Sequence, residues 1–517
     1  MNHLHPLKNL KADIPASIVV FFVALPLCLG IALASGAPLF SGLIAGIIGG
    51  IVVGALSGSA IGVSGPAAGL AAIVLVAIST LGSFENFLLA VVLGGVIQVL
   101  FGILKAGVIG YYFPSSVIKG MLTGIGIIIV IKQVPYFFGI DKNAESSNFI
   151  DMFSQINLGA TLIACVGLLI LITWNVWLSK SFKIFQIIQG PVVAVAVGIV
   201  YYILTKDSST FSIDSAKLVS VPVPEDFSSF LGQFSSPNFD QITNPQIWVT
   251  AFTIALVASL ETLLCVEATD KLDPRKRVTP TNRELLAQGT GNIVSGLIGG
   301  LPITQVIVRS SANIQSGGKT KSSAIIHGFL LLISLIIIPT LLNKIPLSVL
   351  AAVLFIVGYK LAKPQLFATI YKQGWKQFVP FIITVLGIIF TDLLVGIGMG
   401  LAVGIVIILI KNYQNSHFLH IEKKNDDIEK VKMTLAEEVT FINKGAILKE
   451  LEQIAPDTKL EINVKNTRFL DYDIIEILED FLLKAKNRNI EISLISERGN
   501  VKNPKSFIEF FKLKIKK

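Results

Sequence analysis

Apolar stretches follow one another along most of the chain, from residue 13 to residue 410, and polar residues are largely confined to the gaps between them. A helix needs about 20 mainly apolar residues to cross the hydrocarbon layer of a bilayer, and some stretches here are shorter or interrupted by Gly and Pro. The pattern predicts an α-helical polytopic membrane protein with about fourteen spans. Their expected starts are Asp13, Pro38, Pro66, Phe84, Ser115, Leu158, Ile187, Trp248, Glu284, Ile303, Ser322, Ile345, Gln377 and Asp392.

The pattern changes near residue 411, after which charged and apolar residues alternate as they do in soluble α/β domains. We therefore expect a transmembrane domain over residues 1–412 and a small soluble domain over residues 413–517. Composition agrees, because 52% of the 517 residues are hydrophobic, 15% are charged and the mean hydropathy is +0.72. A soluble protein of this length would not need so much apolar sequence.

Basic residues favour one orientation of the spans, since cytoplasmic loops of membrane proteins are enriched in Lys and Arg. With the N-terminus inside, the predicted inner segments hold most of the bases, whereas the longest loop, 205–245, holds five acidic and two basic residues. This predicts a bacterial inner (plasma) membrane protein with both termini cytoplasmic. Seven spans then precede the loop, about 13–204, and seven follow it, about 246–412. An odd number in each half makes them inverted repeats.

Two segments at corresponding places in these halves interrupt the apolar pattern in the same way. Residues 56–75 and 293–308 each run from a Gly- and Ser-rich stretch through a proline, Pro66 or Pro302, into a helical pattern. Each is typical of an extended segment that leads into a half-helix, and two half-helix N-termini near the membrane midplane would attract an anion. The alternative is that Gly and Pro are simply common in membrane helices.

Two charges lie inside apolar sequence. Glu261 interrupts the stretch 248–266, and Arg309 lies in the segment 299–319. Burying a charge in hydrocarbon is costly unless the site is wet or paired, so these residues indicate an ion pathway. Cys265 lies four residues after Glu261 and shares its helix face. Two structural alternatives remain, a permanent Glu261–Arg309 ion pair and an Arg309 side chain bound to loop carbonyls.

Residues 299–329, GGLPITQVIVRSSANIQSGGKTKSSAIIHGF, resemble the SulP family of anion transporters, which is related to animal sulfate, chloride and bicarbonate exchangers. The resemblance extends over residues 62–69, 258–270 and 282–300. Residues 436–454 and 460–495 are similar to the STAS domain that follows the membrane part in this family.

The resemblance implies a core and a gate domain built from intertwined inverted repeats, with the anion between the third and tenth spans and elevator-like movement of the core. It also implies a homodimer. Glu261 matches the carboxylate that binds the coupling proton or sodium in cation-coupled members, and Cys265 lies beside it. The residues implied to bind the anion are Pro66, Ala67, Ala68, Pro302, Ile303, Thr304, Gln305 and Arg309.

The first span departs from the sulfate-associated members, because Leu27 and Ile31 stand where those members carry Gln and Tyr. This apolar version looks more like the bicarbonate-transporting branch, and an apolar lining disfavours a strongly hydrated dianion. Cys265 stands where cyanobacterial bicarbonate carriers have a hydroxyl residue, so a proton is at least as natural a coupling ion as sodium. We expect secondary active transport of a small anion, bicarbonate first, with sulfate:proton symport and a passive channel as alternatives.

Other function classes lack support in the sequence. There is no Walker-type loop, no catalytic constellation and no basic face suited to nucleic acid. The three cysteines lie in apolar stretches and the five histidines have no metal-site spacing. We expect a non-enzyme in the lipid bilayer that needs no cofactor beyond a coupling Na⁺ or H⁺. In the tail, Tyr472 and Asp473 follow Asp471, so the serine phosphorylation of soluble STAS proteins is not expected.

Overall fold

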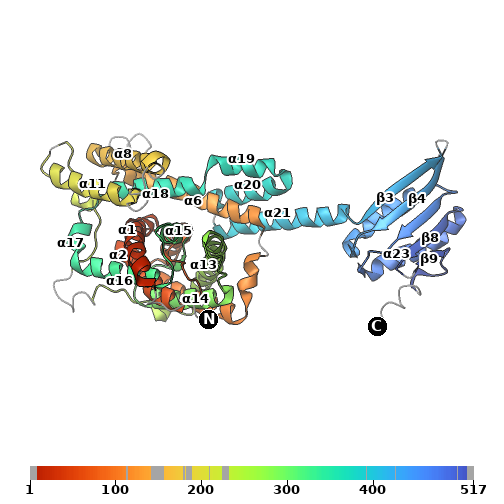
Figure 1. Ribbon diagram of the computed structural model, residues 1–517, viewed down its shortest axis with the longest axis horizontal. Helices are drawn as coiled ribbons and strands as arrows, with labels where there is room; N and C mark the ends of the chain where they lie inside the picture. Colours follow the sequence, from red (N-terminus) through yellow and green to blue (C-terminus); the bar gives the residue numbers. More distant parts are fainter. Residues whose placement is uncertain are drawn as a thin grey trace. The chain divides into compact units, whose positions relative to one another are not determined.

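The computed structural model describes residues 9–111, 114–140, 156–178, 181, 185, 189–208, 210–223, 232–391, 393–424, 427–497 and 499–508. It divides into two compact units, Met1–Leu401 and Ala402–Lys517. Figure 1 shows that the first unit is helical and that the second contains a sheet. The expected span starts Ile187 and Asp392 lie outside the described residues.

Helices account for nearly all regular structure in the first unit. They are α1 (Leu10–Ala34), α2 (Leu39–Ile48), α3 (Gly54–Leu56), α4 (Ala68–Leu81), α5 (Phe84–Ile103), α6 (Ser115–Phe138), α8 (Leu158–Thr173), α11 (Gly190–Thr205), α13 (Pro245–Leu272), α14 (Thr281–Leu297), α15 (Ile307–Gln315), α16 (Ser322–Ile337), α17 (Pro339–Leu342), α18 (Leu347–Leu361), α19 (Pro364–Lys372), α20 (Trp375–Phe390) and α21 (Leu393–Gln414), which continues into the second unit.

A helix begins within four residues of every expected span start that lies in the described part of the chain. Eight helical runs there are long and apolar enough to cross a membrane, and α4, α11, α16 and α20 are shorter apolar helices. The polytopic helical class is therefore confirmed, while the number of fourteen crossings stays a prediction.

Close approach of helix backbones explains several glycines in the first unit. A methyl group on Gly95 of α5 would lie 2.7 Å from the carbonyl oxygen of Gly289 on α14, and one on Gly289 would lie 2.7 Å from the carbonyl oxygen of Gly95. Such contacts replace the hydrophobic driving force that is missing between helices in lipid. They hold α14 firmly against α5, which fixes the position of the polar face of α14 described below.

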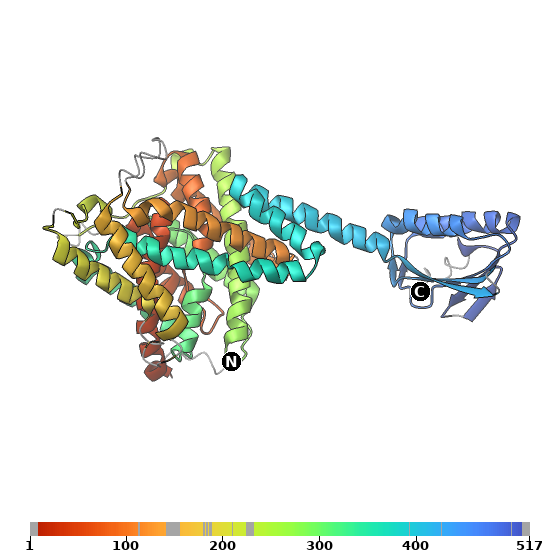
Figure 2. The same ribbon diagram turned by 90° about the horizontal axis from the view of Figure 1, so that it is seen from above.

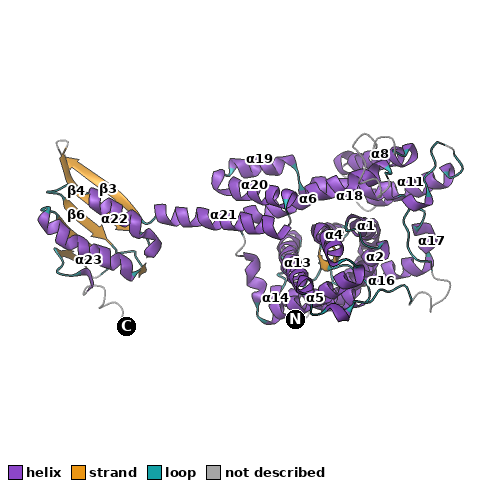
Figure 3. Cartoon of the chain, turned by 180° about the vertical axis from the view of Figure 1, so that it is seen from behind, coloured by secondary structure: helices purple, strands orange, loops and turns teal. Residues whose placement is uncertain are grey.

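Two three-residue strands pair inside the helical unit, where Figure 3 shows a short orange segment near α4, and we call this pair the strand crossing. Strand β1 (Ser64–Pro66) pairs antiparallel with β2 (Ile303–Gln305), so that Ser64 faces Gln305 and Pro66 faces Ile303. The expected extended segments before α4 and α15 are thus confirmed. The expected helix start at Ile303 is four residues early, because the backbone of residues 303–305 takes part in strand pairing and the helix begins only at Ile307.

The second unit has a five-stranded sheet in the order β3-β4-β6-β8-β9. Figure 2 shows the helices of this unit over one face of the sheet. Buried aliphatic residues such as Met433, Ile462 and Leu478 fill the space between them. The elements are β3 (His417–Lys424), β4 (Asp427–Leu435), β5 (Glu438–Val439), α22 (Lys444–Gln453), β6 (Lys459–Asn463), β7 (Phe469–Leu470), α23 (Tyr472–Asn487), β8 (Glu491–Ser496) and β9 (Gly499–Lys502). An α/β region is present where we expected it, and its assignment as a STAS domain stays a prediction.

Candidate functional site

The crossing strands bring the N-termini of α4 and α15 to one place. Ala67 and Val306, the residues directly before the two helices, are both extended, and the first backbone N–H groups of a helix have no acceptor within it. The expected residues Pro66, Ala67, Pro302, Ile303, Thr304 and Gln305 are all buried here, and Ala68 is half-buried. The two prolines lie in or just before the strands and not in a first helical turn. The structure therefore brings both expected segments together.

Glu261 lies on α13 against the first turn of α4. Its side chain is buried, with 8% of the residue exposed, and its Oε2 atom has no hydrogen-bond partner. A methyl group on Gly69 would lie only 2.5 Å from that oxygen, so glycine at this position makes room for the carboxylate. An ionised carboxylate is favoured at a helix N-terminus because the helix dipole is positive there.

Cys265 lies one turn further along α13, close both to Glu261 and to the backbone N–H of Ile307 at the start of α15. The shared helix face that the spacing predicted therefore reaches the N-termini of both half-helices. Two threonines of α13 hold β2 beside this face. The Oγ1 atom of Thr262 accepts from the backbone N–H of Gln305 at 3.3 Å, and Thr269 Oγ1 accepts from Gln305 Nε2 at 3.2 Å.

Arg309 lies behind β1 and has contacts other than those of Glu261. Only 1% of the residue is exposed, its Nη2 donates to Cys28 Sγ of α1 at 3.4 Å, and its Nη1 has no partner. A side chain on Gly65 of β1 would overlap Nη1, so the guanidinium lies directly behind the strand. Neither Arg309 nor Glu261 takes part in an ion pair with any residue that the structure describes. Among the described residues, neither a permanent Glu261–Arg309 ion pair nor a bond from Arg309 to a loop carbonyl is found.

A polar face on α14 that was not expected from the sequence supports both strands. Asn292 Oδ1 accepts from the backbone N–H of Ile303 at 2.5 Å, and Asn292 Nδ2 donates to the carbonyl of Ile303 at 3.1 Å. One turn earlier, Gln288 Nε2 donates to Ser64 Oγ at 2.7 Å and to Glu284 Oε1 at 2.9 Å. The spacing in the sequence indicates this face, because Glu284, Gln288 and Asn292 are four residues apart in α14 and so lie on one side of the helix.

The first helix covers the site with apolar side chains. Helix α1 contacts β1, α4 and α15, and its residues Leu27 and Ile31 are buried. These are the two positions at which the sequence departs from the sulfate-associated pattern. The environment around the strands therefore combines two helix N-termini and a buried cation with an apolar cover, and it contains no group of three or more metal-binding side chains among the described residues.

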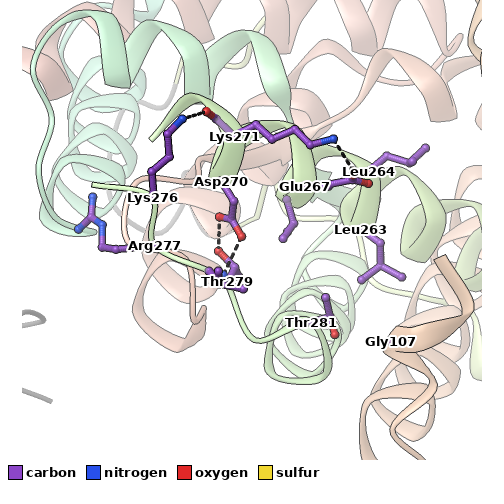
Figure 4. Close-up of a pocket in the computed structure, with 12 residues that line it drawn as sticks. Gly107, Leu263, Leu264, Glu267, Asp270, Lys271, Lys276, Arg277, Thr279 and Thr281 are labelled. Carbon is purple, nitrogen blue, oxygen red and sulfur yellow. Dashed lines mark hydrogen bonds and ion pairs between the residues drawn. The ribbon is translucent and has the colours of Figure 1, made fainter. Parts of the chain in front are cut away.

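The charged residues at the end of α13 line a separate cavity of about 360 Å³. Figure 4 shows Glu267 bonded to Lys271 and Asp270 bonded to Thr279, at 2.5 Å and 2.7 Å. In the following loop, burial alone would raise the pKa of Asp273, but hydrogen bonds from the Arg277 side chain and the Arg275 backbone lower it below its usual value. These charges compensate one another locally and lie outside the strand crossing.

Comparisons with known proteins agree on one family. The sulfate permease family matches residues 10–386. YvdB of Bacillus subtilis, a candidate sulfate transporter, is 26% identical over 512 residues, covering 96% of this chain and 93% of YvdB. The bicarbonate transporter BicA of a Picosynechococcus species is 26% identical over 449 residues, covering 84% of this chain and 76% of BicA.

Solved structures give the same result for the fold. The transmembrane domain of a cyanobacterial bicarbonate transporter BicA superposes with a TM-score of 0.64 at 25% identity, covering 75% of this chain and 98% of that chain. The structure of SLC26A9 superposes with a TM-score of 0.76 at 16% identity, covering 95% of this chain and 85% of that chain. At 16% identity, this second likeness concerns the fold alone.

Proposed function

The chain belongs to the sulfate permease family of membrane-embedded anion transporters, and we propose that it carries bicarbonate by secondary active transport in symport with a proton. One observation carries this proposal. The β1–β2 pair brings two helix N-termini together in the interior of a helical membrane unit, with Glu261 beside one of them.

The electrostatics of the strand crossing suit a small anion. Each helix N-terminus is equivalent to roughly +0.5 of an elementary charge, and the guanidinium of Arg309 behind β1 adds one full charge to the surrounding field. These contributions sum to about two positive charges, which can balance a small anion, bicarbonate or sulfate, without a metal ion. We propose that the anion lies between the first turns of α4 and α15, against Pro66, Ala67, Ala68, Ile303, Thr304 and Gln305.

The position of Glu261 supports proton coupling with a definite sign. An ionised carboxylate at the first turn of α4 neutralises part of the positive field that the anion needs, whereas a protonated one does not. Protonation therefore increases anion affinity, and by thermodynamic linkage the bound anion increases proton affinity to the same extent. Proton and anion then bind together, which is the requirement for symport. A sodium ion would need several oxygen ligands, and Cys265 supplies a sulfur.

The substrate assignment rests on α1. The buried side chains of Leu27 and Ile31 offer no hydrogen bonds to replace the hydration shell of a dianion, which favours bicarbonate over sulfate. Sulfate:proton symport is the second candidate, and the relation to YvdB and to sulfate transporter 4.1 of Arabidopsis thaliana favours it, although this chain matches only half of the latter protein. A passive anion channel is the third, and it gives no role to Glu261.

We further propose that the first unit forms core and gate domains from two inverted repeats and works by an elevator-like movement. The loop charges favour cytoplasmic termini in the bacterial inner membrane. The second unit would be a cytoplasmic STAS domain, and the protein would be a homodimer.

A flux assay in proteoliposomes tests the proposal. Labelled bicarbonate and labelled sulfate are offered separately, with an imposed pH gradient, an imposed sodium gradient or neither. We expect concentrative bicarbonate uptake that follows the pH gradient. Uptake of sulfate in preference to bicarbonate would establish the second candidate. Uptake that depends on the sodium gradient would identify sodium, and not the proton, as the coupling ion. Equal flux without any gradient effect would establish a channel.

A further inference from the structure

A second cavity, of about 710 Å³, opens on the side of the first unit, away from the strand crossing. Parts of α4, α6, α13, α20 and α21 form its walls. Most lining side chains are apolar, among them Ile73, Val76, Ile131, Val249 and Leu394. Pockets that bind small molecules have volumes of about 300–1,000 Å³ and mainly apolar walls with a few polar groups, so this cavity has the dimensions of a ligand site.

The walls of this cavity are continuous with the hydrocarbon-facing surface. Val76, Ile131 and Val249 are 54%, 55% and 62% exposed, which in a membrane protein means contact with lipid. The lining residues come from α4 beyond its first turn, from the later part of α6, from the end of α20 and from the first turns of α13 and α21. A ligand would enter from the bilayer and not from water.

One charge lies in the lining. Lys132 lies on α6 directly after the apolar residues 127–131. Its ammonium has no ion-pair or hydrogen-bond partner among the residues that the structure describes. Polar groups of Thr80, Gln246 and Thr250 lie on the same walls. Lys132 is exposed at this apolar surface, where a cation without a protein partner attracts an anion. The cavity therefore combines an apolar body with a single cationic anchor.

We propose that this cavity binds one anionic phospholipid of the surrounding membrane, with the phosphate against Lys132 and an acyl chain along the apolar walls. The lipid contacts α4, the helix whose first turn receives Glu261. It also contacts α6, α13, α20 and α21, so it fills the space between these helices and α4. The binding itself does not depend on which anion the protein transports.

The experiment measures lipid selectivity of the full chain. Protein reconstituted in vesicles with equal amounts of phosphatidylcholine and phosphatidylglycerol is extracted in mild detergent, and the lipid that stays bound is counted by native mass spectrometry. Unfolding temperature is measured in vesicles of each composition, because a ligand that binds only the folded state raises it. Lys132→Gln removes the charge, and Lys119→Gln on the same helix is its control. Val76→Trp fills the cavity, and Val96→Trp, on an exposed position of α5 outside it, is the second control.

We expect one retained phosphatidylglycerol per chain and a higher unfolding temperature in the vesicles that contain it. Lys132→Gln should reduce the preference for phosphatidylglycerol about fivefold, the contribution of one basic residue near an anionic lipid surface. Val76→Trp should remove the retained lipid, and both controls should keep it. Equal retention of the two lipids by the native protein would overturn the proposal, as would retention in Val76→Trp or an equal loss in Lys119→Gln.

Discussion

The two half-helices at the strand crossing share a backbone plan but differ in their chemistry. Each follows a three-residue strand, and the residue before each helix is extended. Helix α4 carries no charge and receives Glu261 from α13, whereas α15 carries its own charge, Arg309. One half therefore has a carboxylate that can gain or lose a proton, and the other has a permanent cation. Both helix N-termini contribute a similar positive field, whereas the side chains differ: Glu261 can titrate and Arg309 stays charged.

The strands are also held differently. Asn292 binds both the N–H and the carbonyl of Ile303, and Thr262 and Thr269 bind Gln305, so β2 is fixed from two helices. On β1, Gln288 binds only the Ser64 side chain. The half with the permanent charge is thus the more firmly fixed one. This comparison can be tested by substitutions on each half.

The largest effect is expected from filling the space between the half-helices. Ala67 and Thr304 are 1% and 0% exposed, so Ala67→Phe and Thr304→Phe should each abolish anion flux in proteoliposomes without any change of charge. Leu100→Phe, at an exposed position of α5, is the control and should retain flux. If only one of the two site variants blocked flux while both were folded, the anion would belong to one half-helix alone.

Loss of the Glu261 carboxylate should have the second-largest effect on transport. Glu261→Gln keeps the shape and removes the charge, so pH-driven accumulation of labelled anion should vanish while anion exchange persists. The control is Glu267→Gln on the same helix, whose carboxylate is exposed and paired with Lys271. Unchanged accumulation in Glu261→Gln would assign the coupling site to another residue.

Removal of the permanent charge should have a graded effect. Arg309→Ala should weaken anion binding by about 1–3 kcal/mol, roughly 5- to 150-fold in dissociation constant, since the field behind β1 loses a full charge. Arg309→Lys should recover part of that loss. The measurement is anion affinity by titration calorimetry on purified protein, and equal affinities for native protein and the Ala variant would remove Arg309 from the site.

The difference in strand support predicts a smaller effect on stability. Asn292→Ala leaves two buried backbone groups of Ile303 without a partner and should lower stability by about 1–3 kcal/mol. Ser64→Ala should cost less, because Gln288 keeps its bond to Glu284. Thermal unfolding in detergent compares the two variants, and an equal or larger loss for Ser64→Ala would reverse the assigned roles of the strands.

The smallest effect is expected in the second unit. Hydrogen bonds from Lys430 and Lys432 to Glu461 lower the pKa of that carboxyl below its usual value. A lowered pKa adds stability above the ordinary carboxyl range that is lost as the pH falls through it. Glu461→Gln should therefore make stability of this unit less sensitive to acid while leaving anion flux unchanged. A loss of flux at neutral pH would show that the second unit contributes to the site.

Local sequence predicted the parts of the site and not their contacts. Pro66 and Pro302 lie after glycines in both halves, and this alone predicted two extended segments that lead into helices. The four-residue spacing of Glu261 and Cys265 predicted their common face. The pairing of Ser64 with Gln305, however, joins residues about 240 positions apart. No local pattern specifies such a register.

The direction of Arg309 and the role of Asn292 could not be predicted for the same reason. Arg309 points behind β1 because Gly65 leaves room for it, and Gly69 leaves room for Glu261. In both cases the space is provided by a glycine on another segment of the same chain. Asn292 was recognisable as a member of a polar face, but its partner, the backbone of Ile303, depends on how tightly α14 and α5 pack through Gly95 and Gly289.

The pairing of β1 with β2 has a consequence for biosynthesis. A ribosome adds about 5–20 residues per second, so β2 leaves it some 10–50 s after β1. During that interval β1 lacks its partner strand, and unpaired backbone groups in hydrocarbon cost several kcal/mol each. Until then the backbone groups of β1 need other partners, in the translocation machinery or among water and lipid head groups, before the first half of the chain can adopt its final structure. The proposed anion site is therefore completed only when the second half of the chain arrives.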